Sequence, residues 1–156
     1  MTNADAPTQP LIRMDGTASI QDAAHLMCDM SMGAMGVDGP DGAFAGLVTE
    51  RDILWAVAQG KDSETTTLAD ILNDFPIVVE GPLSTDAAAR KMRQGHVRHL
   101  IVRQGDGLRI VSMRDLLVAY LDMSGSEGAE HLASLMEMYR MFGASFRLED
   151  RSGASA

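Results

Sequence analysis

The chain has 156 residues, a formal net charge of −9 at pH 7 and a hydrophobic content of 46%. A chain of this length suits one compact domain or two half-sized repeats that share a core. Nucleic-acid binding draws its affinity from clustered Lys and Arg, so the acidic balance argues against a nucleic-acid partner and against an anionic membrane surface. A small phosphorylated ligand stays possible, because local bases and helix ends matter more for such a ligand than the net charge does.

The cysteine content and the apolar stretches bear on location. Cys28 is the single cysteine, which excludes an intramolecular disulfide. No stretch approaches the roughly 18 apolar residues of a membrane-spanning helix, and the first residues carry neither a basic nor an apolar segment. We therefore expect a cytoplasmic protein without a membrane partner. Cys28 lies in an amphipathic helix pattern, and we expect it to be a buried small hydrophobe.

Residues 1–10 are small and polar with two prolines, which predicts a flexible tail. The next segments alternate between the period of a strand and that of a helix. They predict a first repeat over 11–60, in the order strand, helix, strand, strand, helix, at residues 11–14, 20–30, 33–37, 43–48 and 50–59. In its second helix we expect a buried face that contains Ile53, Leu54, Val57 and Trp55.

The same order returns in a second repeat over residues 68–122. A polar connector over 61–67 and a short helical turn over 68–72 come first, followed by the predicted elements at 76–79, 84–94, 97–102, 108–111 and 114–121. An amphipathic helix over 127–142 has no counterpart after the first repeat. This C-terminal helix packs either within the chain or against a dimer partner, and the pattern favours neither. Residues 150–156 read as a flexible tail.

One motif organises both repeats. Residues 46–54 (GLVTERDIL) return 63 residues later as residues 109–117 (RIVSMRDLL), and in each copy a strand gives way to a hydroxyl residue and then to a helix with an Asp in its first turn. The Thr49/Asp52 and Ser112/Asp115 pairs fit a capping box, in which hydroxyl and acid satisfy free backbone N–H groups. They equally fit a ligand site, because a helix N-terminus attracts phosphate and Asp accepts hydrogen bonds from sugar hydroxyls.

Taken together, the repeated motifs resemble the CBS domain family, named after cystathionine β-synthase, and specifically a tandem pair called a Bateman module. The motifs that carry the resemblance are Asp22-Ala23-Ala24, residues 33–37 and residues 46–54, with Asp86-Ala87-Ala88, residues 97–102 and residues 111–117 in the second repeat. The resemblance implies an α/β (α+β) fold of tandem β-α-β-β-α repeats with pseudo-twofold symmetry. Two small packed sheets would be flanked by helices, with clefts between the repeats and one extra C-terminal helix.

The resemblance also implies a function. Family members bind an adenosine-containing ligand such as AMP, ADP, ATP or S-adenosylmethionine, usually form a homodimer, and regulate a partner protein without being catalysts. We expect the same here, with no required cofactor.

By position, the resemblance places a ribose-binding acid at Asp52 and Asp115, and hydroxyls near the phosphate at Thr49 and Ser112. Two bases at the same helix starts could neutralise phosphate. The implied adenine pocket uses backbone groups of an opening strand and of the strand after the first helix, and His99 and His96 lie close enough in sequence to reach a phosphate. The remaining candidates are Arg51 and Arg114 for phosphate, with Ile12, Gly33 and Ala34, or Ile77, Val97 and Arg98, for adenine.

Two departures from the family pattern stand out. The usual Gly before the hydroxyl motif is Gly46 in the first repeat and Arg109 in the second, where a side chain would narrow the cleft or add a cation. The Pro common in the middle strand is replaced by Gly36 and Ile101. Since the second repeat is also richer in bases, we expect an anionic ligand at Ser112 and Asp115.

The sequence leaves two other classes of function open. A dimeric interaction scaffold with empty clefts would act through Met-rich faces and the helix over 127–142. A nucleotide-dependent hydrolase is less favoured, because no nucleophile elbow, phosphate-binding loop or dinucleotide fingerprint occurs. His96 and His99 have no Cys or acid close by in sequence, so we expect no metal site.

Overall fold

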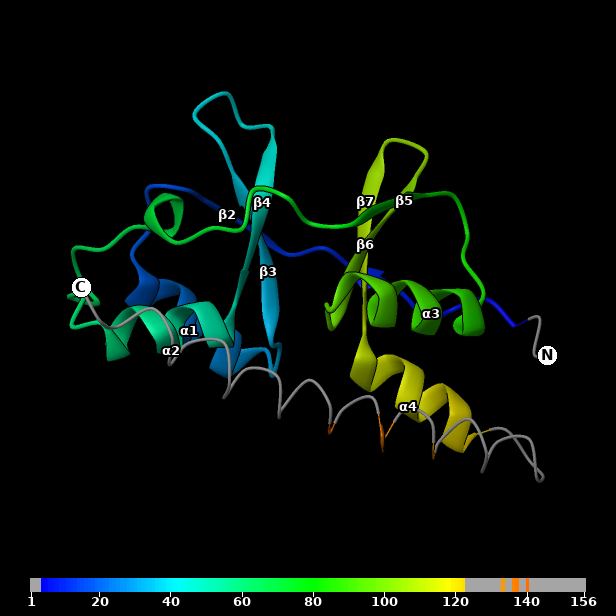
Figure 1. Ribbon diagram of the computed structural model, residues 1–156. Helices are drawn as coiled ribbons and strands as arrows, with labels where there is room; N and C mark the ends of the chain where they lie inside the picture. The colour runs from blue at the N-terminus through cyan, green and yellow to red at the C-terminus, as the bar shows by residue number, and fades with distance from the viewer. Residues whose placement is uncertain (1–3, 123–132, 134–135, 138–139, 141–156) are drawn as a thin grey trace. The chain divides into compact units, whose positions relative to one another are not determined.

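The computed structural model of the chain describes residues 4–122, 133, 136, 137 and 140. The chain divides into two compact units (Figure 1). One is Pro10–Ile77, and the other combines residues 4–9 with the chain from Val78 onward. Residues 61–77 group with the first unit and residues 4–9 with the second.

The first unit is a three-stranded sheet with two helices. Its strands are β2 (Arg13–Asp15), β3 (Ala34–Asp38) and β4 (Phe44–Thr49), in the order β2-β3-β4, with β2 parallel and β4 antiparallel to β3. Its helices are α1 (Ile20–Asp29), α2 (Glu50–Ala58) and the 3-10 turn η1 (Leu68–Asp70). This confirms the predicted order of elements in the first repeat.

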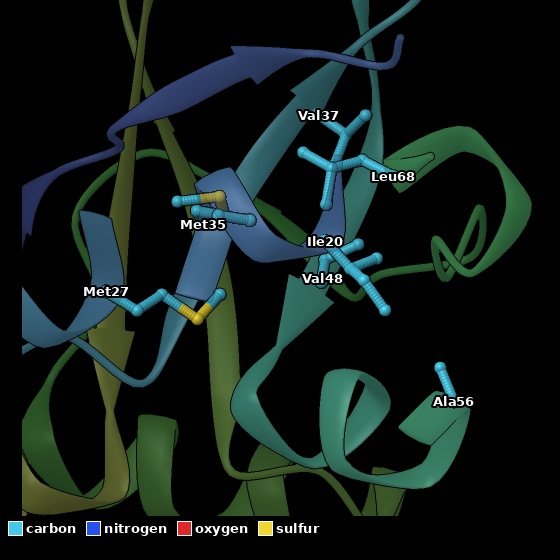
Figure 2. Packing of buried hydrophobic residues seen from close by; sticks show 8 residues of the cluster. Ile20, Met27, Met35, Val37, Val48, Ala56 and Leu68 are labelled. Carbon is cyan, nitrogen blue, oxygen red and sulfur yellow. The ribbon is translucent and has the colours of Figure 1, made fainter. Parts of the chain in front are cut away.

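The core of the first unit is aliphatic and thioether. Met35 and Val37 of β3 and Val48 of β4 are fully buried, and so are Ile20 of α1 and Leu68 of η1. Figure 2 shows these side chains gathered between the sheet and the helices. Methionine therefore acts as a core filler here, as the composition suggests.

The second unit has a four-stranded sheet in the order β1-β7-β6-β5. Its strands are β1 (Gln9–Pro10), β5 (Val78–Glu80), β6 (His99–Gln104) and β7 (Gly107–Ser112). Its helices are α3 (Thr85–Gly95) and α4 (Met113–Leu121). The buried residues include Leu100, Ile101 and Val102 of β6.

The N-terminal segment differs from the predicted flexible tail. The Ala6 amide donates to the Leu83 carbonyl at 2.7 Å, and the Thr85 amide donates to the Ala4 carbonyl at 3.0 Å. Ala6 is buried, and the segment ends as β1 beside β7. Residues 4–10 are therefore part of the second repeat's sheet and its surroundings.

Four residues predicted to be buried are exposed, three in α2 and one in α1. In α2 only Ala56 is buried, whereas Leu54 is 69% exposed and Val57 is 51% exposed. Trp55, at 44%, is exposed as well. Cys28 is also exposed, because α1 turns Ile20, Ala23 and Met27 to the core and Cys28 follows on the other face.

Most of the predicted helix over 127–142, and the tail over 150–156, lie outside the described residues. Among the described residues, no helix has the length and apolar character needed to cross a membrane.

Candidate ligand-binding site

In both repeats a strand ends at a hydroxyl residue that caps the next helix. Thr49 Oγ1 donates to Asp52 Oδ2 at 2.6 Å and accepts from the Asp52 amide at 3.3 Å, while the Thr49 amide donates to the same Oδ2 at 2.8 Å. Ser112 and Asp115 repeat these bonds at 2.6, 3.2 and 2.7 Å. The capping-box interpretation is therefore confirmed in both copies.

The capping bonds leave one side of each acid without a role in the cap. Within the described chain, every hydrogen bond recorded for the Asp52 and Asp115 side chains goes to Oδ2. Both residues are only partly buried. A carboxylate held in this way offers Oδ1 as a preoriented acceptor, so a cap does not exclude a ligand role.

Strand pairing brings the start of one strand to each helix start. Ala34 pairs with Thr49, and the Glu50 amide donates to the Gly33 carbonyl at 3.0 Å. Gly33 and Ala34 therefore lie beside the Thr49/Asp52 cap.

The second repeat has the same arrangement. His99 pairs with Ser112, and the Met113 amide donates to the Arg98 carbonyl at 2.9 Å. Since directly opposed residues of neighbouring strands place their side chains on the same face, the His99 imidazole and the Ser112 hydroxyl share a face. Arg98 and His99 thus lie beside the Ser112/Asp115 cap.

The opening strands flank this arrangement. The Gly36 amide donates to the Ile12 carbonyl at 2.8 Å and Arg13 pairs with Gly36, so Ile12 lies opposite Met35, one residue beyond Ala34. In the second repeat Ile77 directly precedes β5, whose Val78 pairs with Ile101, two residues beyond His99. Because the pairing is parallel, Ile77 comes opposite Leu100, one residue beyond His99, so Ile12 and Ile77 both lie near the caps.

The three other predicted residues take different positions. Arg51 and Arg114 are the second residues of α2 and α4, at the helix starts where a phosphate would be attracted. Val97 lies in the turn between α3 and β6, where its amide donates to the Met92 carbonyl at 3.0 Å. A bond that ends α3 in this way leaves the Val97 amide occupied within the repeat.

Two residues beside the caps were missed by the sequence analysis. Glu50 and Met113 directly follow the two hydroxyl residues and begin the two helices. A Cβ added at Gly33 would lie 3.1 Å from Glu50 Oε1, so the carboxylate lies close to Gly33. An alignment of the two repeats shows the difference, because Glu50 and Met113 occupy equivalent positions and only Glu50 is charged.

The departure at positions 46 and 109 has a structural reason in each repeat. At Gly46 a Cβ would collide with the carbonyl oxygen of Asn73, whose backbone exchanges hydrogen bonds of 2.8 and 3.0 Å with Leu47. At the equivalent place in the second repeat, the Arg109 side chain donates to Thr8. The expected extra cation for the ligand is therefore engaged by the N-terminal segment.

One buried polar contact joins the helices of the second repeat. The Tyr120 hydroxyl of α4 donates to Asp86 Oδ1 of α3 at 2.7 Å, and Tyr120 is 2% exposed. Burial, together with this bond and the negative charge of Asp86, raises the pKa of the Tyr120 phenol well above its ordinary value. The Asp86 motif that supports the family resemblance thus fastens α3 to α4.

The comparisons with known proteins agree with this architecture. A family model for the CBS domain matches residues 65–122. The chain is similar to CBS domain-containing protein YhcV of Bacillus subtilis (strain 168), with 32% identity over 116 residues that make up 73% of this chain and 81% of the relative.

Solved structures give the same result. The CBS domain protein PAE2072 from Pyrobaculum aerophilum, complexed with AMP, is similar with a TM-score of 0.64 and 28% identity, covering 83% of this chain and 95% of that chain. The CBS-domain containing protein ATU1752 from Agrobacterium tumefaciens has a TM-score of 0.66 and 25% identity, covering 76% of this chain and 97% of that chain. With two such repeats and a relative of this identity and coverage, the chain belongs to the CBS domain family.

Proposed function

We propose that the chain is a regulatory module that binds an adenosine-containing ligand beside its two capped helix starts and signals to a partner protein. The observation that carries the proposal is the doubled arrangement of strand start and capped acid, with Ala34 opposite Thr49 and His99 opposite Ser112. A relative that is 28% identical and covers 83% of this chain is complexed with AMP, which supports an adenosine ligand.

Each part of the arrangement has a role in this proposal. Oδ1 of Asp52 or Asp115 accepts from the ribose hydroxyls, because Oδ2 is already used by the cap. Where the ligand carries a phosphate, the positive end of the helix dipole, together with Arg51 or Arg114, attracts it. Backbone groups at the strand starts and opening strands recognise adenine. No step of this scheme moves a proton, so we propose a binding protein and not an enzyme.

The test is a calorimetric titration of the purified chain with AMP, ADP, ATP and S-adenosylmethionine. Asp115→Asn and Asp52→Asn remove the charge that holds ribose, and we expect each to weaken binding at its own site at least tenfold, which corresponds to about one charge-assisted hydrogen bond.

The matched control is Asp70→Asn. Asp70 likewise accepts hydrogen bonds from the Thr67 hydroxyl and amide, at 2.8 and 2.9 Å, but at η1 and away from the strand starts. It should bind like wild type. If Asp70→Asn lost as much affinity as Asp115→Asn, the capped acids would act only through folding. Absence of binding across the panel would reject the proposal.

A ligand-free scaffold is the second candidate, and exposed apolar side chains on the second helix of each repeat favour it. Leu54 and Val57 of α2 and Val118 and Leu121 of α4 are each at least half exposed. We propose that these exposed helix faces, one in each unit, pair two copies of the chain into a homodimer. Sedimentation of wild type and of Leu54→Glu with Leu121→Glu tests this, since an unchanged mass would count against a homodimer built on these helices.

A further inference from the structure

The two candidate sites share their geometry but differ in charge. Over residues 10–77 the chain has three Lys and Arg against eleven Asp and Glu, whereas over residues 78–122 it has seven against five. The difference therefore runs through whole repeats, and it reaches the residues nearest the caps.

The charge difference between the two sites lies at three equivalent positions around each cap. At the start of the first strand the pair Gly33 and Ala34 corresponds to Arg98 and His99, because Ala34 opposes Thr49 as His99 opposes Ser112. At the start of the helix Glu50 corresponds to Met113. The first site thus has an acid where the second has a thioether, and no base where the second has Arg and His.

We infer that Glu50 sets the ligand charge accepted by the first-repeat site. This site takes an adenosine ligand without net negative charge, whereas the second-repeat site takes a phosphorylated one. The inference rests on the proposed function, since it assigns a ligand class to each of its two sites.

The backbone of Glu50 is fixed by its neighbour Gly33, and its side chain lies close to the same residue. Its amide is bound to the Gly33 carbonyl at 3.0 Å, and its Oε1 would lie 3.1 Å from a Cβ at Gly33. The exposed carboxylate therefore lies beside the strand start, one residue from the hydroxyl implied to lie near phosphate. A dianionic phosphate there would face both Glu50 and Asp52 in the first turn of α2, whereas α4 presents only Asp115 in its first turn.

The bases of the first repeat do not offset this difference. Arg13 is paired with Asp38, with Nη1 and Oδ1 3.0 Å apart. Arg51 has an equivalent in Arg114, so a base at that position is common to both sites and cannot distinguish them. The contrast between the sites therefore depends on Glu50 and on the bases at the start of β6.

The test isolates the first site with Asp115→Asn and titrates the full chain with AMP and with adenosine at low salt. AMP carries close to two negative charges at pH 7, whereas adenosine is neutral. We expect adenosine to bind the first site at least tenfold more tightly than AMP. Glu50→Gln, or Glu50→Met to match the second repeat, is then added to this variant. Either change should raise the AMP affinity about tenfold and leave the adenosine affinity unchanged. A tenfold gain is what removing one unit charge roughly 7 Å from the phosphate gives in a partly aqueous setting.

The matched control is Glu64→Gln. Glu64 is an exposed acid of the same repeat, so it changes the net charge equally but lies in the connector and not at the helix start. An equal gain in AMP affinity from Glu64→Gln would assign the effect to overall charge and overturn the role of Glu50.

The second site is isolated by Asp52→Asn, where AMP should bind more tightly than adenosine. Arg98→Gly with His99→Ala installs the residues of the first repeat and should remove that preference. Equal affinity of both ligands at both sites of otherwise functional protein would overturn this inference and leave the proposed function intact. Absence of adenosine and AMP binding at both sites would overturn both.

Discussion

The Arg109 guanidinium holds Thr8 by two hydrogen bonds between residues 101 positions apart. Nε donates to Thr8 Oγ1 at 2.7 Å and Nη2 donates to the Thr8 carbonyl at 2.8 Å. Arg109 lies in β7, next to β1, so the contact fastens the N-terminal segment at the edge of the sheet. The residue that departs from the family pattern therefore has a structural partner.

Arg109→Gly, which installs the residue of the first repeat, should release the segment. Losing a pair of hydrogen bonds to a charged group costs about 1.5–3 kcal/mol of unfolding free energy. Amides of residues 4–10 should then exchange with deuterium faster, as measured by mass spectrometry. Arg103→Ala is the control, because Arg103 makes an exposed pair with Glu80 at 3.1 Å that is worth less than about 1 kcal/mol. Unchanged exchange in Arg109→Gly would show that the backbone bonds alone hold the segment.

Gly46→Ala tests the close approach of Asn73 to β4. The new methyl group would collide with the Asn73 carbonyl oxygen and the Leu72 side chain, so the paired bonds with Leu47 must lengthen or break. We expect a loss of about 1–3 kcal/mol in urea unfolding, typical of overpacking. Gly107→Ala in β7 is the control, since its Cβ would meet nothing closer than 3.5 Å. Equal stability of the two variants would contradict the close approach.

The Tyr120–Asp86 contact predicts a loss of stability at alkaline pH. Folding raises the pKa of the Tyr120 phenol. The contribution of the contact to the free energy of unfolding is therefore complete below the ordinary pKa of about 10, and it is lost as pH rises through the higher pKa of the folded state. In Tyr120→Phe this alkaline loss should shrink, while stability at pH 7 falls by about 1–2 kcal/mol because Asp86 loses a partner. Urea midpoints of both proteins at pH 7, 9 and 11 measure this. Parallel pH profiles would contradict the buried contact.

Asp70 should make the stability of the protein depend on pH in the opposite direction, with a loss at acid pH. Hydrogen bonds from the Thr67 amide and hydroxyl lower its pKa. The contribution of the carboxylate is therefore present above the ordinary value of about 3.9 and is lost as pH falls through the lower folded value. Wild type should melt at a higher temperature than Asp70→Asn at pH 7, and the gap should close below about pH 3. A gap independent of pH would show that the ionised form of Asp70 has no special role.

The sequence predicts the capped helix starts well, because a capping box is local. A hydroxyl, an acid three residues on and the helix between them suffice, and Thr49/Asp52 and Ser112/Asp115 both form it. The order of strands and helices was also predictable, since each element carries its own hydrophobic period. Pairing of Ala34 with Thr49 follows once β3 and β4 are recognised as one hairpin.

Features that depend on distant partners were not predictable in this way. Residues 4–10 have the composition of a tail, and their place is set by distant partners, namely Leu83, Thr85, the edge of β7 and the Arg109 side chain. Leu54 and Val57 fit the apolar period of α2 but are exposed. Periodicity identifies an apolar helix face, but it does not show whether another part of the protein covers that face. A role for Glu50 was not predicted, because its charge distinguishes the two repeats only when Glu50 is compared with the equivalent residue, Met113.

The place of residues 4–9 has a consequence for synthesis on the ribosome. The segment is made about 100 residues before β7, the strand that it joins. At roughly 5–20 residues per second, it waits for several seconds or more while Pro10–Ile77 can already fold. Sequence changes near residue 8 should therefore show their effect late, as slow completion of the second repeat and not of the first.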